Sequence, residues 1–343
     1  MSHPTTSRVA AERDAARRER TAWGLERPAL GISLGGDAAA TAWRARRRWV
    51  EQAESLGLHS VWLPEMHFQR GVCPAPLVEL AAWVPSTRRL RLGTTSLLLP
   101  LHPPDELAAE IAALDQLSQG RALIGLGRGF QRRMLEAFRV NPAEKRDRFD
   151  AALDRMLARW AEGRRRGDAF ATHSDPHPPL AVAAFGPKGL GQAARRGLPY
   201  LASPVETLDQ IAANLRRHRA GLPDPQRPPL TLALRTLFVS DVASERQAIR
   251  ERLAGELTAR GIGLPRAIHA AIEAPLEERV LVASPEEAIE RLVRDRERVP
   301  LDLLIARPQL EGIASDVLER SLAWLAGTVW PAVLARSTTR PTG

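Results

Sequence analysis

Two acid–base side chains stand together in the segment VWLPEMHF (Val61–Phe68), directly after a short apolar run. Glu65 supplies a carboxylate and His67 an imidazole, a group that can titrate near physiological pH. Such a pair could transfer protons, or the histidine could brace the carboxylate in a buried hydrogen-bond network. Met66 lies between them and can do neither, because a thioether does not exchange protons at neutral pH.

A candidate anion site is indicated by Arg128, which lies between Gly127 and Gly129 in the run GLGRGF. A guanidinium can bind a phosphate through two parallel hydrogen bonds while backbone N–H groups of a glycine-flanked loop approach the same anion. The alternative is an ordinary surface arginine, since the chain is rich in arginine and glycines also serve tight turns. The position between two glycines favours the anion site.

A second run of this kind, AFGPKG, ends at Gly189 and contains Gly186 and Lys188. We expect a helix to begin here, and the free N–H groups at a helix N-terminus attract anions. Lys188 would add positive charge to that site, or it could be a solvated lysine beside a Gly-Pro turn.

Each of these candidates follows a continuous apolar run that predicts a buried strand, and amphipathic helical patterns separate the runs. Eight parallel strands that alternate with helices predict an α/β protein with a (β/α)₈ barrel. An open doubly wound sheet is the competing fold, but no dinucleotide-binding fingerprint supports it. Active sites of such barrels lie at the carboxyl ends of the strands, where these candidates fall. The predicted strands span residues 28–35, 60–64, 90–100, 122–127, 179–186, 198–203, 230–240 and 301–308.

We expect the barrel to form one domain over residues 28–336. Residues 1–27 are polar and predict a flexible or weakly helical extension with little core material, and residues 337–343 predict a disordered tail. No apolar run approaches the ~20 residues of a membrane span, and the N-terminus lacks the apolar core of a secretion signal. Cys73 is the only cysteine, so no disulfide framework or multi-cysteine metal site is expected, and a cytoplasmic location is predicted.

The net charge of +9 raises the question of nucleic-acid binding. The basic residues are almost all arginines, and they are spread along helix-like segments where Glu and Asp alternate with them. Nucleic-acid-binding proteins concentrate their positive charge on one face or arm, usually beside aromatic residues. We therefore expect an arginine-rich solvated surface and no nucleic-acid partner.

The stretch GTTSLLLPLHPPDELAAEIAALDQLSQGRALIGLGRGFQRRMLEAFRV (Gly93–Val140) resembles the signature region of the bacterial luciferase-like monooxygenases. VWLPEMHF stands where that family has a Trp–Leu–x–Glu–His–His–Phe segment, and QAARRGLPYLAS and VASPEEAIERL extend the resemblance over about residues 29–335. It implies a (β/α)₈ barrel that binds a reduced flavin, FMN or the deazaflavin F420, as a diffusible cosubstrate at the carboxyl rim. Oxygenases of the family use O₂, whereas deazaflavin members transfer hydride.

The resemblance also implies roles for individual residues. Arg128 matches the arginine that holds the flavin phosphate, and the run around Lys188 matches the rest of that phosphate site. Thr95 and Ser96 match a dipeptide joined by a non-proline cis peptide bond under the flavin ring. Phe185 departs from the polar residue common at its position. The predicted cofactor-binding residues are Thr95, Ser96, Leu126, Arg128, Phe185, Gly186, Lys188 and Gly189.

Met66 replaces the histidine that is the proposed proton-transfer residue of the luciferases, so the light-emitting mechanism is not carried over. Glu65 and His67 remain as the predicted catalytic residues. The bracing role of His67 is favoured, because the second histidine of the family points away from the flavin ring. His102, just after the third predicted strand, is interpreted as a loop histidine near the rim.

Three functions follow from these expectations. The first is a monooxygenase that acts on a small organic substrate with O₂ and with reduced FMN from a separate flavin reductase. The second is F420- or FMN-dependent hydride transfer without O₂, which the loss of the histidine at Met66 keeps open. The third is a non-catalytic flavin-binding subunit. A homodimer without metal is expected in each case.

Overall fold

Eight parallel strands form a closed barrel in the computed structural model, which describes residues 14, 17–34, 43–68, 73–225, 229–259, 273–307 and 313–338. Strand β9 pairs with β1, with Leu303 opposite Ala29, and β6 pairs with β7, so the ring has no free edge. This confirms the predicted (β/α)₈ barrel. In ring order the strands are β1 (Ala29–Ser33), β2 (Ser60–Leu63), β3 (Arg91–Leu98), β4 (Ala122–Gly127), β5 (Leu180–Ala183), β6 (Tyr200–Ala202), β7 (Leu232–Val239) and β9 (Leu303–Arg307).

A ninth strand, β8 (Val280–Ala283), was not predicted from the sequence. It pairs with the second half of β7, from Thr236 to Val239, whereas β9 pairs with the first half. The run VLVA is only four residues long and stands between charged helical segments, so its pattern does not distinguish it from part of a helix.

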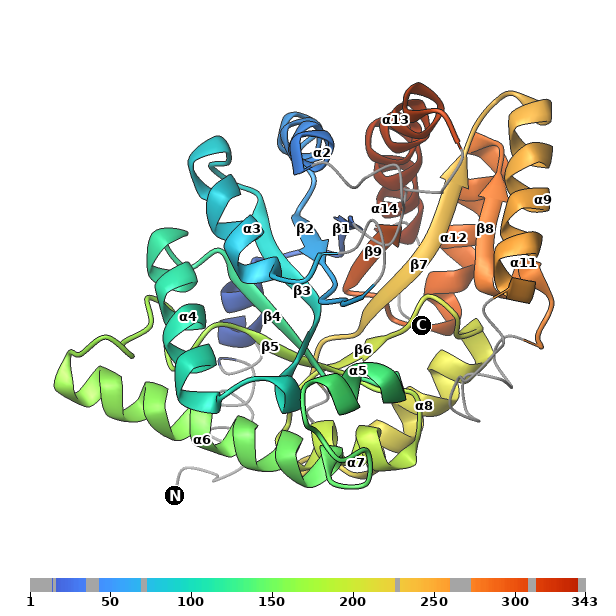
Figure 1. Ribbon diagram of the computed structural model, residues 1–343. Coiled ribbons are helices and arrows are strands. Elements are labelled where there is room, and N and C mark those ends of the chain that lie inside the picture. The colour runs from blue at the N-terminus through green and yellow to red at the C-terminus, as the bar shows by residue number, and fades with distance from the viewer. Residues whose placement is uncertain are drawn as a thin grey trace, which may run out of the picture.

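Helices surround the barrel on its outer face (Figure 1). A helix begins at the AFGPKG run as expected: α7 starts at Pro187 with Gly186 as its N-cap. Before α6 begins at Lys145, the Asn141 side chain accepts a hydrogen bond from the N–H of Ala143 and forms a turn. The helices are α2 (Trp43–Ser55), α3 (Pro76–Trp83), α4 (Pro104–Leu117), α5 (Arg132–Ala137), α6 (Lys145–Arg166), α7 (Pro187–Arg195), α8 (Leu208–Ala220), α9 (Ala243–Ala259), α11 (Leu276–Arg279), α12 (Pro285–Arg298), α13 (Ser315–Trp324) and α14 (Trp330–Thr338).

Apolar side chains form two layers, one inside the barrel and one between the barrel and its helices. Successive side chains of a strand point to opposite faces, so neighbouring residues belong to different layers. In β4, Leu123 belongs to the inner cluster, while Ile124 belongs to the outer one. The inner cluster fills the amino-terminal half of the barrel around Trp62, which is fully buried. The carboxyl-terminal half is therefore the half that is available for a site.

The floor of the barrel is built by residues that precede β1. Residues 17–23 are helical, and the Trp23 ring stacks on Trp62 with 6.5 Å between ring centroids. Trp23 and Leu25 are 2% and 0% exposed, so the expectation of little core material before residue 28 is wrong for these two residues. A polar, arginine-rich surrounding sequence hides their core role. Residues 1–13, 15 and 16 lie outside the described residues.

At the other end of the chain, α14 continues to Thr338 and thus includes the first two residues of the predicted tail; residues 339–343 lie outside the described part. Upward from Leu123, the inward positions of β4 are occupied by Gly125 and Gly127. A Cβ at Gly125 would overlap the Thr94 carbonyl oxygen, and one at Gly127 would overlap Ser96 Oγ. These glycines let β3 and β4 approach closely at the carboxyl rim.

Candidate active site

Glu65 is the centre of a buried hydrogen-bond network at the carboxyl end of β2. Its side chain is 3% exposed, and its Oε2 accepts a hydrogen bond from the N–H of Leu98 at 2.7 Å. Its Oε1 lies 2.7 Å from His67 Nε2 and 2.9 Å from His102 Nε2. The carboxylate thus joins the ends of β2 and β3 and holds two imidazoles at the same oxygen.

The charge state of this network follows from its contacts. Burial raises the pKa of Glu65, but hydrogen bonds and charge from His102 and hydrogen bonds from Leu98 and His67 outweigh burial, and the pKa lies below its ordinary value. Burial lowers the pKa of His102, but the hydrogen bond and the negative charge of Glu65 reverse that effect and raise it. Glu65 is therefore an anion, and each histidine donates its Nε2–H to it.

This arrangement fixes the orientation of His67. Because Nε2–H donates to the Glu65 carboxylate, Nδ1 is the ring atom of neutral His67 that can accept a proton. The His67 ring lies 4.7 Å from the Phe138 ring and 5.9 Å from the Phe68 ring, measured between centroids. The contact that braces Glu65 also selects the tautomer of His67, so the predicted bracing role and the predicted acid–base role are compatible with the same geometry.

The peptide bond between Thr95 and Ser96 is cis, as predicted. Thr95 Oγ1 lies 3.3 Å from the hydroxyl of Ser33 on β1, and the carbonyl of Ser96 accepts the N–H of Glu65 at 3.2 Å. Both residues are partly exposed at the carboxyl rim. The dipeptide thus lies directly beside the Glu65 network.

Arg128 is held against the start of α7. Its Nη1 donates to Gln192 Oε1 at 2.9 Å, and Gln192 Nε2 donates in turn to Asp150 on α6 at 2.8 Å. A Cβ at Gly189 would overlap the guanidinium, so glycine provides the space in which Arg128 lies. The side chain is partly buried, and burial lowers its pKa. A partly buried, oriented guanidinium beside a helix start can bind a phosphate through charge-assisted hydrogen bonds.

Lys145 adds a second cation that the sequence analysis did not select. Its Nζ donates to the carbonyl of Gly129 at 3.2 Å, and its pKa is lowered by burial and then by the positive charges of Arg128 and Arg146. The pKa values of Arg128 and Lys145 are both lowered by burial and by neighbouring positive charge, so an anion placed between these side chains would be stabilised. No pattern in the sequence marked Lys145, because it begins α6, the second helix after β4, and reaches Gly129 only through the folded loop.

The remaining predicted cofactor residues differ in placement. Gly186 is the N-cap of α7, and a Cβ there would meet no atom within 4 Å, so the space beside it is open. Lys188 is exposed and Phe185 is partly exposed next to it. Leu126, in contrast, is fully buried in the layer between barrel and helices. Its side chain does not face the rim, because it alternates with Gly125 and Gly127, so any cofactor contact there would come from its backbone.

The structure brings the acidic and basic candidates to one rim. Ser96 contacts Glu65 on one side through its carbonyl, and its hydroxyl lies against Gly127 on the other. Arg128 follows Gly127 directly in the chain. Among the described residues, no group of three or more His, Cys, Asp or Glu side chains could hold a metal ion, and none of the described helices has the length and apolar character of a membrane span.

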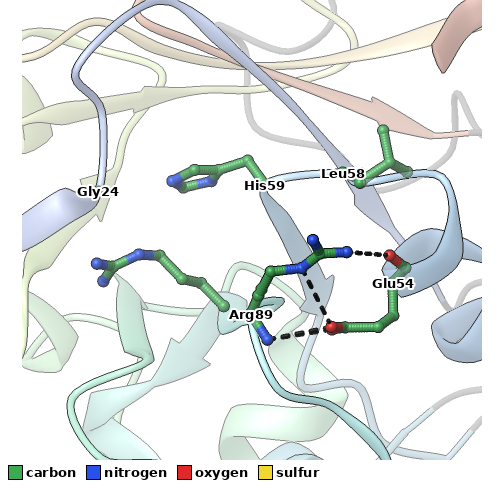
Figure 2. A pocket seen from close by; sticks show the side chains of 7 residues that line it. Gly24, Glu54, Leu58, His59 and Arg89 are labelled. Atoms are coloured by element: carbon green, nitrogen blue, oxygen red, sulfur yellow. Dashed lines mark hydrogen bonds and ion pairs between the residues drawn. The ribbon is translucent and has the colours of Figure 1, made fainter. Parts of the chain in front are cut away.

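A cavity of about 380 Å³ lies at the opposite, amino-terminal end of β2 and β3, lined by Gly24, Glu54, Gly57, Leu58, His59, Arg89 and Arg91 (Figure 2). Its charged residues serve the structure. Glu54 accepts hydrogen bonds from Arg89, Arg91 donates to the carbonyl of Ala22 at 2.9 Å, and His59 Nε2 bonds the carbonyl of Trp23 at 2.9 Å. This cavity belongs to the attachment of the barrel floor, away from the candidate site.

Comparison with known proteins gives a consistent result. Residues 29–302 match the family described as luciferase-like monooxygenase. The chain is 30% identical to 4-hydroxyprotoasukamycin monooxygenase of Streptomyces nodosus subsp. asukaensis, over 52% of this chain and 53% of that protein. It is 27% identical to the oxygenase component of the flavin-dependent trigonelline monooxygenase of Acinetobacter baylyi, over 68% and 70%. It is 32% identical to the F420-dependent glucose-6-phosphate dehydrogenase of Kineococcus radiotolerans, over 48% and 53%.

A solved structure supports the fold. The monooxygenase RslO1 from Streptomyces bottropensis superposes with a TM-score of 0.75 at 24% identity, over 88% of this chain and 99% of that one. Several sequence matches are partial, and the chain spans 62%, 51% and 53% of the length of three of the curated relatives it matches.

Proposed function

Because the chain belongs to the luciferase-like monooxygenase family, we propose that it is a flavin-dependent monooxygenase that uses reduced FMN and O₂ on a small organic substrate. The observation that carries the flavin part of the proposal is the phosphate seat, by which we mean the Arg128 guanidinium held by Gln192 in the space that Gly189 leaves free, at the start of α7. This is a receptor for a terminal phosphate, which FMN has and riboflavin lacks.

The residues at the rim fit the rest of such a cofactor. Arg128 and Lys145 would hold the phosphate, together with the backbone N–H groups at the start of α7 beside the open space at Gly186. The Thr95–Ser96 dipeptide, with its cis peptide bond, would contact the flavin ring from the side of the strands. When bound, a reduced flavin would supply the two electrons that O₂ activation needs.

Residues of the chain itself would hold and transfer protons. The Glu65 carboxylate stays ionised and orients His67, whose Nδ1 is then the atom that accepts or returns a proton. His102 lies 2.9 Å from the same carboxylate, and the hydrogen bond and negative charge of Glu65 raise the pKa of His102, which favours its charged form there. Met66 contributes no proton, because its side chain is a thioether.

The second candidate is hydride transfer with F420 or FMN and without O₂. Met66, in the place of the luciferase histidine, favours it, as does the similarity to the F420-dependent dehydrogenase of Kineococcus radiotolerans. The phosphate seat does not discriminate between the two cofactors, since both carry a phosphate on the ribityl chain. We further propose a separate flavin reductase as partner in the first case, and a homodimer in both.

The test is to mix the protein with reduced FMN or reduced F420 without oxygen and then to admit O₂ in a stopped-flow spectrometer. We expect reduced FMN to bind and to react with O₂ with absorbance changes that free flavin does not show. Tight binding of reduced F420 without reaction with O₂ would favour hydride transfer, and binding of neither would contradict both proposals. Arg128→Ala should abolish binding, whereas Arg133→Ala, which removes an exposed arginine of α5, is the matched control.

A further inference from the structure

We propose that Phe68 and Phe138 form an aromatic shelf at the mouth of the site and that the substrate presents a flat aromatic ring to it. The inference deepens the proposed function and rests on it for the identity of the reacting site. The shelf is defined by these two side chains and by His67, which lies next to both.

Phe68 is placed in an unusual way. Its side chain is 60% exposed, although it is large and apolar, and its φ of 61° lies in the left-handed region that non-glycine residues rarely adopt. It stands three positions after Glu65, at the carboxyl end of β2. A backbone of this kind at a functional rim is a reason to look for a ligand contact.

The three rings form one compact group. The Phe68 and Phe138 centroids are 6.0 Å apart with planes inclined by 47°, and the His67 centroid lies 5.9 Å and 4.7 Å from them. Inclined rings at these separations attract each other through face and edge, and they leave the outer face of Phe68 open to a further ring. A ring stacked on that face would be separated from His67, the proposed proton-transfer residue, by the Phe68 ring.

Phe138 gives the shelf a fixed base. It follows α5 and packs on a small buried cluster of Leu98, Leu101, Met134, Leu135 and Val140. Leu98 also donates its N–H to Glu65, so the same short segment of β3 supports both the shelf and the carboxylate. The shelf therefore has a fixed position relative to the acid–base network, and a surface that orients a substrate requires such a fixed position.

An aromatic occupant fits this surface better than an aliphatic one. Pairs of aromatic rings gain energy beyond the area that they bury, equivalent to a factor of about three to ten in binding. A saturated substrate would gain only the free energy of burying apolar surface. Any large apolar side chain with ordinary backbone angles would provide that equally well.

The experiment compares 2-naphthol with its saturated counterpart decahydro-2-naphthol, using NMR titrations to obtain two dissociation constants. The full chain should bind the aromatic probe several-fold more tightly than the saturated one. Phe68→Leu, which keeps apolar volume and loses the ring, should reduce that preference about three- to tenfold, and Phe68→Tyr should retain it. Phe130→Leu, at another exposed phenylalanine (39% exposed), is the control and should leave the preference unchanged.

Three results would overturn the shelf: equal binding of both probes, binding of neither, or an unchanged preference in Phe68→Leu. A change of oligomeric state in Phe68→Leu with an unchanged probe preference would instead assign Phe68 to a contact between copies of the chain. Binding of reduced FMN is measured in parallel. If FMN binds normally while the shelf fails, the proposed function stands; if FMN does not bind to the unaltered protein, the proposed function fails whatever the probes do.

Discussion

Gly189→Ala tests the phosphate seat without removing any charged group. The added Cβ would stand 2.7 Å from Nη1 and 2.8 Å from Cζ of Arg128, and closer still to Nη2. Non-bonded atoms settle at about 3.5–4.0 Å, so the guanidinium must retreat by about 1 Å. It can do so without unfolding the protein, since it is the far end of a flexible side chain, but it then gives up its position beside Gln192.

The expected loss follows from the contacts that Arg128 would make. A charge-assisted hydrogen bond contributes about 1.5–3 kcal/mol, which corresponds to a factor of about 10 to 100 in affinity when its geometry is lost. We expect the dissociation constant of reduced FMN to rise by that factor and that of reduced riboflavin to stay nearly constant, because riboflavin has no phosphate.

The assay is an anaerobic titration that follows quenching of tryptophan fluorescence, with FMN and riboflavin measured on the same preparation. Gly191→Ala, in the same helix, is the control: its Cβ would meet only Arg195 Nη1, at 3.5 Å, and alanine favours a helix by about 0.5–1 kcal/mol. An unchanged FMN affinity in Gly189→Ala would remove Arg128 from the phosphate role. Equal losses for FMN and riboflavin would point to general damage of the site.

Three further predictions concern the floor of the barrel and the acid–base network. Trp23→Ala should lower the free energy of unfolding by about 3–5 kcal/mol in denaturant titrations, because it empties the space against Trp62; a loss below 1 kcal/mol would contradict the floor. Burial lowers the pKa of His59 to about 4, so the unfolded chain binds more protons than the folded one between about pH 6.5 and 4. The free energy of unfolding should therefore fall by up to about 3 kcal/mol as the pH decreases through that window. His59→Gln should flatten this pH dependence, and an equally steep curve in the variant would refute the assignment. Glu65→Gln should lower the pKa of His102 in NMR titrations, since the carboxylate that raises it is gone, and an unchanged titration would show that the two side chains do not interact in solution.

The barrel strands could be predicted because parallel strands covered on both faces leave long apolar runs, as in ALIGLG of β4. β8 could not, because four apolar residues among charges fit a helix equally well. Trp23 was not predicted for a different reason. It lies before β1, outside the alternation of strands and helices, and its ring partner Trp62 lies on another element, so no sequence periodicity marks it.

For the site, the contact between Glu65 and His67 was foreseeable because the two residues are close in sequence. The contact with His102 was not, since it joins residues 37 positions apart through loop geometry that a single sequence does not determine. The same holds for Lys145, which reaches the Gly129 carbonyl from the next helix but one. The cis bond at Thr95–Ser96 came from the family resemblance, because no propensity predicts it.

The floor of the barrel also bears on how the chain is made. Arg20 pairs with Asp302 at 2.7 Å across 282 positions, and β1 finds its partner in β9. During synthesis β1 leaves the ribosome long before β9, so β1 cannot be paired on both sides until β9 has been made. A nascent chain stopped before β9 would leave one edge of β1 unpaired, and an unpaired strand edge can associate with other chains.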